Sequence, residues 1–476
     1  MRILLTIPPV EGLPATRPPL ELGYSAACLE ELDHEVLIRD YGLTPHMPVD
    51  EAADVVCREE PDLVGIETAT YRLAECIEMA RLVKETSGAF VVLGGPHPTV
   101  RPVETLAYPG VDAVIIGEAE ETGVEIVKRV AEGRSLDGVA GTAYKDNGEI
   151  RRNEPRPVIA DLDRLPFPDR EAMQVADYPL RLHSGEMMTN LISSRGSARK
   201  RVFYLPDITG LEYRARTAES VVEEIRSVVE DHGFPAVSFD DTGFTFDQPR
   251  LRRILELMES RDLVVRWECT AQVDVLGEED YARMVRAGCA SIVFDNLTGN
   301  TVAIERMGYD TMLAQVRDAV RWCKKLGIRT KGSFLTGLPG ETRDNIERTA
   351  ELAVELDMDE SSFSIVVPVP GTALWDTAAA VHPELNSSRQ YPTAVHMRTG
   401  TGQHVFANMS DLADGDLVEA TAEAYDTFWK RVIRRRQFNE RFGPELGDFV
   451  WRVSLLTKFK PVRSLKRAAA RLRGKS

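Results

Sequence analysis

The chain opens with Arg2-Ile3-Leu4-Leu5-Thr6-Ile7-Pro8-Pro9, an apolar run that stops at two prolines. The apolar residues predict a buried strand. The two prolines predict its end, because proline has no backbone N–H with which to extend a sheet. After a loop that ends at Pro18-Pro19, the apolar spacing becomes that of an amphipathic helix over residues 20–32. A strand, a loop and a helix in this order predict the first unit of a parallel α/β sheet.

The same alternation continues to about residue 145. Strands are expected at residues 2–7, 35–39, 63–68, 90–93 and 113–116, and further helices at 49–60, 72–86 and 121–132. We therefore predict a Rossmann-like, doubly wound domain over residues 1–145. Ligands of such domains bind at the carboxyl ends of the strands, which here are the loops 8–19, 68–72, 94–99 and 117–121.

A second α/β domain is expected after a linker. Asn147-Gly148 predicts a hairpin turn, and repeated prolines predict an extended linker over residues 146–189. Strands are then expected at 190–194, 236–239, 264–270, 291–294, 329–336 and 361–368, and helices at 218–232, 249–260, 278–287, 311–326 and 343–356. Six such units over residues 190–376 predict a partial (β/α)6 barrel rather than a closed eight-stranded one. Residues 377–476 are expected to form a helical C-terminal region with a basic tail.

Composition narrows the function. The 476 residues include 58 basic and 75 acidic side chains, a net charge of −17, which argues against a nucleic-acid-binding protein. Apolar runs are too short for a membrane span and the start lacks a signal-peptide cleavage pattern, so we expect a cytoplasmic protein. Six scattered cysteines predict neither a disulfide framework nor a zinc site. The basic tail over residues 458–475 could touch an acidic membrane surface weakly, and a solvated terminus is the alternative.

Four motifs of the first domain occur in a telling order: Pro18-Pro19-Leu20-Glu21-Leu22-Gly23-Tyr24, Pro61-Asp62-Leu63-Val64-Gly65-Ile66, Gly94-Gly95-Pro96-His97-Pro98-Thr99 and Val111-Asp112-Ala113-Val114-Ile115-Ile116-Gly117-Glu118. Together they resemble the cobalamin-binding half of the cobalamin-binding radical S-adenosylmethionine (SAM) enzymes. The second domain resembles the other half of that family through these segments: Leu191-Ile192-Ser193-Ser194-Arg195-Gly196, Ser238-Phe239-Asp240-Asp241-Thr242-Gly243-Phe244-Thr245, Arg286-Ala287-Gly288-Cys289, Gly337-Leu338-Pro339-Gly340-Glu341-Thr342 and Pro368-Val369-Pro370-Gly371-Thr372. The resemblance covers about residues 1–376.

The resemblance implies bound cobalamin with its base detached. No Asp-x-His-x-x-Gly motif is present to supply a histidine ligand to cobalt, and Tyr71 or Arg72 is the candidate for the lower cobalt face. Glycines at strand ends let the backbone approach a large ring closely. A purely structural role is the alternative for His97. The expected cofactor-binding residues are Pro9, Thr68, Thr70, Tyr71, Arg72, Gly94, Gly95, Pro96, His97, Gly117 and Glu118.

The chain departs from this family at its cluster loop. Where relatives carry Cys-x-x-x-Cys-x-x-Cys, it has Ser197, Arg201 and Tyr204. Iron–sulfur clusters need soft thiolate ligands, so we expect no [4Fe–4S] cluster here. Leu297 stands where relatives have an acidic side chain that helps hold SAM, so SAM binding stays open.

Three functions remain. The first is a cobalamin-dependent enzyme that uses polar rather than radical chemistry on a small organic substrate in a biosynthetic pathway, with a reductase for cobalt as a partner. Methyl transfer is the favoured reaction, and cyclisation or rearrangement is the alternative. The second is a catalytically silent scaffold for a partner enzyme, and the third is a cobalamin or SAM carrier or sensor.

Side chains at the barrel's strand ends are the candidates for chemistry. The expected catalytic residues are Asp240, Asp241, Asp295 and Tyr204, with a turn cap as the alternative for Asp241 and a surface turn for Asp295. The expected substrate-binding residues are Arg195, Arg201, Trp267 and Lys331. An arginine there suits an anionic group, whereas a core position is the alternative for Trp267 and a surface position for Lys331.

Overall fold

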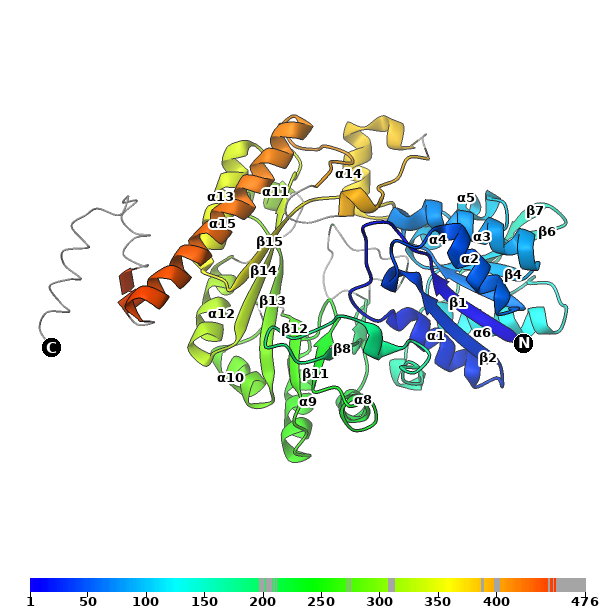
Figure 1. The fold of residues 1–476 in the computed structure, drawn as a ribbon, viewed down its shortest axis with the longest axis horizontal. Coiled ribbons are helices and arrows are strands. Elements are labelled where there is room, and N and C mark those ends of the chain that lie inside the picture. Colours follow the sequence, from blue (N-terminus) through cyan, green and yellow to red (C-terminus); the bar gives the residue numbers. More distant parts are fainter. Residues whose placement is uncertain are drawn as a thin grey trace, which may run out of the picture.

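The protein has two α/β domains that lie side by side, as a computed structural model shows (Figure 1). The structure describes residues 1–196, 212–271, 275–306, 313–386, 389–397 and 403–443, together with a few single positions between and after these ranges. Ser197, Arg201 and Tyr204 and the basic tail lie outside the described residues.

The first domain is built on a seven-stranded sheet in the order β2-β1-β3-β4-β5-β6-β7. The first five strands are parallel, and β6 and β7 pair antiparallel at one edge. The strands are β1 (Arg2–Ile7), β2 (Glu35–Asp40), β3 (Leu63–Glu67), β4 (Phe90–Gly94), β5 (Ala113–Ile115), β6 (Thr142–Asp146) and β7 (Glu149–Arg152). The strand order reverses between β1 and β3, which is the topological switch point at which doubly wound sheets bind ligands.

Side chains of each strand point alternately to the two faces of this sheet, and a different core covers each face. Ile3 and Leu5 of β1 pack with α1 and α6, whereas Leu4 packs with α2 and α3. The longer helices are α1 (Leu20–Glu30), α2 (Val49–Arg58), α3 (Leu73–Ser87) and α6 (Ala119–Ala131), and two short ones are α4 (Pro96–Val100) and α5 (Pro102–Ala107). This confirms the predicted doubly wound class.

The predicted hairpin turn is present at Asn147 and Gly148, which have φ angles of 49° and 86°. Positive φ at both positions is what a two-residue hairpin requires. The turn joins β6 to β7, so the first sheet continues to Arg152, past the expected boundary at residue 145.

The second domain is a partial barrel of six parallel strands in consecutive order. The strands are β8 (Met188–Leu191), β11 (Ala236–Phe239), β12 (Arg266–Thr270), β13 (Cys289–Leu297), β14 (Arg329–Thr336) and β15 (Glu360–Ile365). The helices that follow them are α8 (Ala218–Glu230), α9 (Gln248–Ser260), α10 (Glu278–Arg286), α11 (Thr301–Arg306), α12 (Leu313–Leu326) and α13 (Arg343–Leu356). A short antiparallel pair, β9 (Ser194–Arg195) and β10 (Arg214–Ala215), stands apart from the barrel sheet. This confirms the predicted partial barrel.

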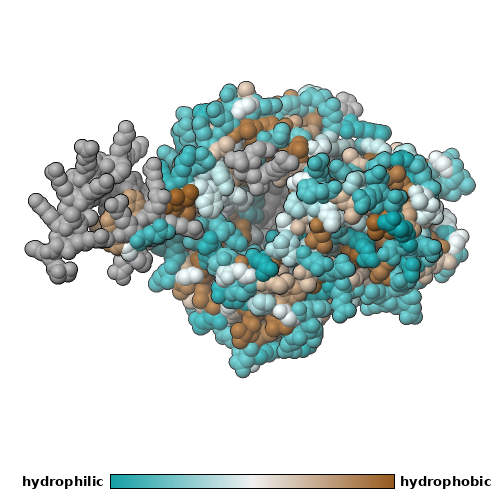
Figure 2. All heavy atoms as spheres, viewed as in Figure 1, coloured by the Kyte–Doolittle hydropathy of each residue, from teal (hydrophilic) through white to brown (hydrophobic). Residues whose placement is uncertain are grey.

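The C-terminal region contacts both domains. Helix α15 (Asp414–Phe442) packs against α13 and β15 of the barrel, and α14 (Ala373–Val381) precedes it. Between the two, Tyr391 reaches the first domain, where its hydroxyl donates to Glu104 Oε2 at 2.8 Å. Among the described residues, no helix is long and apolar enough to cross a bilayer. The face drawn in Figure 2 is mostly hydrophilic, with hydrophobic residues in small patches.

Candidate functional site

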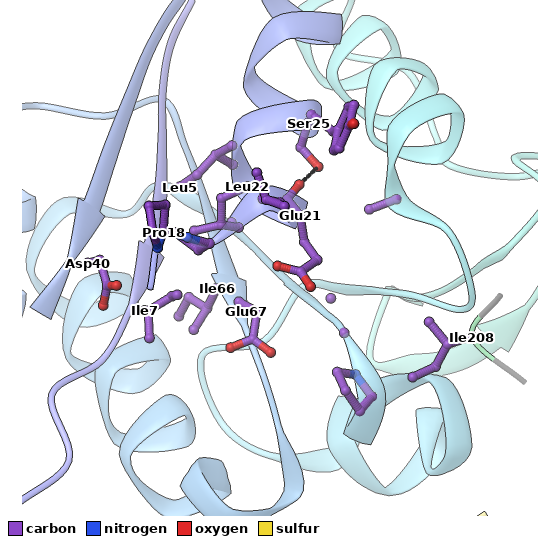
Figure 3. Close-up of a pocket in the computed structure, with 18 of the residues that line it drawn as sticks. Leu5, Ile7, Pro18, Glu21, Leu22, Ser25, Asp40, Ile66, Glu67 and Ile208 are labelled. Atoms are coloured by element: carbon purple, nitrogen blue, oxygen red, sulfur yellow. Dashed lines mark hydrogen bonds between the residues drawn. The ribbon is translucent and has the colours of Figure 1, made fainter. Parts of the chain in front are cut away.

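A cavity of about 780 Å³ lies between the two domains. The first domain contributes the carboxyl ends of its strands and the first turn of α1, and the barrel contributes Asn190, Arg195 and Asp240. Figure 3 shows part of its lining, with Glu21 extending from α1 and Glu67 from the end of β3. Its size is that of a site for a bound small molecule or cofactor.

Glycines give the cavity a wall of bare backbone. Gly94 at the end of β4, Gly95 after it and Gly117 after β5 line the cavity, and Gly123 lines it from α6. A Cβ added to Gly123 would meet no protein atom within 4 Å, so it would project into open space. Gly95 has φ 105°, a conformation that other residues rarely adopt. This wall suits the close approach of a large flat ligand.

The expected cofactor-binding residues fall into two groups. Seven line the cavity: Tyr71, Arg72, Gly94, Gly95, Pro96, Gly117 and Glu118. Four do not appear in its lining: Pro9, Thr68, Thr70 and His97.

His97 is fully buried behind the cavity wall. Its backbone N–H donates to the Thr68 carbonyl at 3.0 Å, its Nδ1 lies 3.2 Å from Thr70 Oγ1, and the Tyr391 ring covers it at 4.8 Å. Burial lowers the pKa of His97 to about 4, so the ring is neutral at pH 7. The three residues therefore hold the loops behind the wall.

A side chain that the sequence did not single out, Glu67, controls the orientation of Arg72. The Arg72 guanidinium lies 3.1 Å from the Glu67 carboxylate and donates to the Tyr71 hydroxyl at 2.7 Å. Burial raises the pKa of Glu67 to about 7, although Arg72 acts to lower it. The cavity wall thus presents an arginine and a tyrosine held by one buried carboxyl group.

Asp240 is the expected catalytic residue that reaches the cavity. It pairs with Arg17 from the first domain, and it accepts hydrogen bonds from Asn190 Nδ2 at 2.9 Å and Ser238 Oγ at 3.2 Å. Asn190 also donates to the Pro18 carbonyl at 3.0 Å. These contacts join the first strands of the barrel to the loop that precedes α1.

Arg195 closes another edge of the cavity across the domain boundary. It lies 3.0 Å from Glu118 and also pairs with Glu120, and Arg214 lies 3.0 Å from the same oxygen of Glu118. All four side chains are largely buried. Two barrel arginines and two carboxylates of the first domain therefore form one cross-domain ion network. Arg195 was expected to bind an anionic substrate, and in this structure its partners are protein carboxylates.

The cavity is acidic overall, because more carboxylates than cations line it among the described residues. The carboxylates are Glu21, Asp40, Glu67, Glu118, Glu120 and Asp240, and the cations are Arg17, Arg72 and Arg195. Local sequence offered no signal for Glu21, because an acidic residue in a helix's first turn is ordinary.

The remaining barrel candidates lie away from this lining. Asp241 is buried and accepts four hydrogen bonds, from the backbone and hydroxyl of Ser193 and the hydroxyl of Ser194. Trp267 is fully buried against Phe239 and Phe244. The structure therefore gives Trp267 a place in the core rather than in the substrate cavity.

Lys331 of β14 pairs with Glu268 of β12 at 2.7 Å across the intervening strand β13, so both side chains lie on the same face of the barrel sheet. Asp295, half-buried, lies where the pairing of β13 with β14 is irregular, and it accepts from Asn296 Nδ2 at 3.0 Å. Asp295 was expected after the end of its strand, but β13 extends to Leu297. Lys331, Glu268 and Asp295 are all absent from the lining of the cavity.

A sheet that opens at its strand ends onto a partial barrel, with one cavity between them, defines a class of two-domain cofactor-dependent enzymes. Comparison with protein families agrees. The B12-binding domain family matches residues 13–127, and the radical SAM superfamily matches residues 201–353. The chain belongs to the cobalamin-binding radical SAM family of enzymes.

Relatives cover most of the chain. It is 33% identical over 388 residues to an uncharacterized methyltransferase of Pyrococcus horikoshii, covering 80% of this chain and 83% of the relative. It is 25% identical to a cytidylyl-2-hydroxyethylphosphonate methyltransferase of Streptomyces wedmorensis, over 76% of this chain and 78% of that one. It is also 25% identical to an anaerobic magnesium-protoporphyrin IX monomethyl ester cyclase of Rubrivivax gelatinosus, over 75% and 66% of the two chains.

Solved structures share the fold. The radical SAM methyltransferase TsrM from Kitasatospora setae, solved with cobalamin and a [4Fe–4S] cluster, matches with a TM-score of 0.65 and 20% identity. The match covers 80% of this chain and 75% of TsrM. The cobalamin-dependent enzyme OxsB matches with a TM-score of 0.62 and 18% identity, over 81% and 56% of the two chains.

Proposed function

We propose that this protein is a cobalamin-dependent methyltransferase that acts on a small organic substrate by polar chemistry, without an iron–sulfur cluster. The observation that carries the proposal is the cavity lined both by glycines of the first domain and by Asn190, Arg195 and Asp240 of the second. The wall suits a corrin ring, because Gly94, Gly95, Gly117 and Gly123 line it without side chains and a Cβ at Gly123 would meet only open space.

Bound cobalamin supplies the two-electron transfer of a methyl group. Tyr71 and Arg72 line the cavity wall, and either would be able to contact the bound cofactor. No histidine occurs among the described residues that line the cavity, which supports a base-off cofactor without a histidine ligand. His97 is turned toward Thr70 behind the wall instead.

The absence of a cluster is proposed from the sequence. Ser197, Arg201 and Tyr204 occupy the positions of the three cluster cysteines, and none of them is a thiol. Hydroxyl and guanidinium groups are poor ligands for the irons of such a cluster. Leu297, in place of an acidic SAM contact, is buried in the barrel wall.

The barrel residues would bind and prepare the substrate. Lys331 and Glu268 give the barrel one cation and one anion at 2.7 Å from each other, and both can exchange that contact for a polar substrate group. Asp240 lines the barrel side of the cavity, where it can accept a proton from a substrate nucleophile. Asp241, with four hydrogen bonds, positions the loop that carries Ser193 and Ser194.

The test is the metal content of the full chain, purified without oxygen after expression with hydroxocobalamin, iron and sulfide. We expect about one cobalt per chain, a base-off visible spectrum and no iron. Transfer of labelled methyl from the reconstituted protein to small nucleophiles would then identify the substrate class. Protein without cobalt would contradict the cobalamin site, and stoichiometric iron with sulfide would contradict the proposal of a cluster-free enzyme.

A further inference from the structure

The cavity has an apolar inner part, which we call the inner channel, between the first sheet and the helices α1 and α6. Its lining consists of Leu5, Leu63 and Val92 from β1, β3 and β4, and of Leu29, Ile126 and Val127 from α1 and α6. Leu5 is one of the side chains drawn in Figure 3. These residues are buried in the first domain, yet the cavity reaches them. The inner channel is therefore open space inside the core of that domain.

Leu63 shows how deep the inner channel is. It is the first residue of β3, whereas Glu67, the last residue of that strand, lines the cavity at its mouth. A strand rises about 3.3 Å per residue, so the lining follows β3 for roughly 13 Å. On the opposite wall the lining runs from Leu20 in the first turn of α1 to Leu29 near its end. A ring that lies against the glycines at the strand ends leaves this depth for another part of the ligand.

The side chains of the inner channel offer no hydrogen bond to a ligand. On α1 the next lining residue toward the mouth is Ser25, and its hydroxyl donates to the Glu21 carbonyl at 2.9 Å. The strand backbones of β1, β3 and β4 pair with one another across the sheet. A polar group that enters the channel would lose its water without gaining a partner, which costs free energy. The channel therefore suits an apolar group.

We propose that the inner channel selects among cobamides by the base of their nucleotide tail, accepting an apolar aromatic base and rejecting a purine. This inference rests on the proposed cobalamin site, because only a cofactor with its base detached presents that base to the protein. Dimethylbenzimidazole and p-cresol present methyl groups on an aromatic ring. Adenine presents an amino group and additional ring nitrogens, which the channel would leave unpaired. An apolar part of the substrate is the other group that would fit, and the experiment separates the two.

The experiment measures the affinity of the full-length protein for cobalamin, p-cresolylcobamide, pseudocobalamin with adenine as its base, and cobinamide without a base. Equilibrium dialysis is performed with every corrinoid reduced to cobalt(I) by titanium(III) citrate. Cobalt(I) binds no lower ligand, so the cost of detaching the base is absent from every affinity. We expect cobalamin and p-cresolylcobamide to bind comparably, and pseudocobalamin about ten-fold or more weakly, because its polar groups lose water without gaining partners. Cobinamide should also bind about ten-fold or more weakly than cobalamin, since it leaves the apolar channel unfilled.

Val92→Thr keeps the shape of the side chain and adds a hydroxyl to the inner channel. It should narrow the ratio of the cobalamin to the pseudocobalamin affinity about three-fold or more, because the hydroxyl can pair with the purine. Val91→Thr is the matched control: Val91 is the neighbouring residue of β4, but it is buried on the other face of the sheet, in the core with α2 and α3. It should leave the ratio unchanged. Thermal unfolding verifies that both variants are folded, and the wild-type comparison stands without them.

Several results would overturn the inference and leave the cobalamin site standing. Pseudocobalamin that binds as tightly as cobalamin would show that the channel does not select the base. Cobinamide that binds as tightly as cobalamin would show that no base enters the channel, and would leave the channel to an apolar part of the substrate. An equal change of the ratio in both valine variants would show that selection arises elsewhere. If the wild type binds no corrinoid at all, the proposed function falls and the inference falls with it.

Discussion

The cross-domain ion network offers the sharpest test of how the cavity is held together. Replacing Arg195 with methionine keeps much of the side-chain volume and removes the charge. Glu118 would keep Arg214 at 3.0 Å, but Glu120, only 6% exposed, would lose its one ion-pair partner in the described part of the chain. Removing one member of a buried ion pair costs about 3–5 kcal/mol, because the other charge stays buried.

The double variant Arg195→Met with Glu120→Met should recover most of that loss, since neither charge remains. Urea unfolding of the cobalamin-free protein, followed by circular dichroism, gives each free energy of unfolding. Arg134→Met is the control, because Arg134 pairs with Glu132 at the surface with more than half of each side chain exposed. That change should cost at most about 1 kcal/mol.

The reasoning would be refuted if Arg195→Met cost no more than Arg134→Met. It would also be refuted if the double variant were as unstable as the two single losses added together, since the charges would then not be coupled. Spectroscopic titration with hydroxocobalamin adds a second readout, because a looser domain boundary should weaken binding in the single variant.

Three further variants test the cavity and its surroundings. Gly123→Leu should raise the melting temperature, because glycine inside a helix costs about 1 kcal/mol. The same change should weaken hydroxocobalamin binding at least about ten-fold, because the leucine side chain would fill open space in the cavity. An unchanged affinity would show that the cofactor binds elsewhere. Burial raises the pKa of Glu67 to about 7, so the folded state binds a proton that the unfolded chain releases near pH 4.5. As the pH rises from 4.5 to 7, the contribution of Glu67 to the free energy of unfolding therefore falls by up to about 3 kcal/mol. Glu67→Gln should flatten this part of the pH profile in urea unfolding, and an identical profile would contradict the shift. Trp267→Ala should lower the free energy of unfolding by about 3–5 kcal/mol in the same assay, because Trp267 lies in the core. The hydroxocobalamin affinity of the folded protein should not change. A selective loss of affinity would contradict the core position of Trp267.

The sequence predicts the elements well because their signals are local. The apolar alternation of Arg2–Ile7 and Arg329–Thr336 gives both strands with their observed ends. The end of β13 is missed, because its irregular pairing carries the strand through the polar Asp295 and Asn296, which locally resemble a turn.

The site is predicted in part, for a different reason. Glycines and prolines at strand ends mark the cavity wall, since the topology alone brings those ends together. Glu21 and Glu67 are missed because what matters is which atoms surround each carboxylate, and those atoms come from other elements. His97 stands in a motif beside the cavity, yet only the packing of Tyr391 and Thr70 turns its ring away from it.

The span of the cavity lining along the chain determines when the cavity can form during translation. Its lining runs from Leu5 to Met397, so no shorter nascent chain contains all of it. At about 5–20 residues per second, ribosomes need roughly 20–80 seconds to reach Met397. The strand ends of the first domain are synthesised long before then, and they stay open to solvent until the second domain is complete. The complete cavity therefore forms only after synthesis has passed Met397, and a ligand that needs both of its walls can bind only from then on.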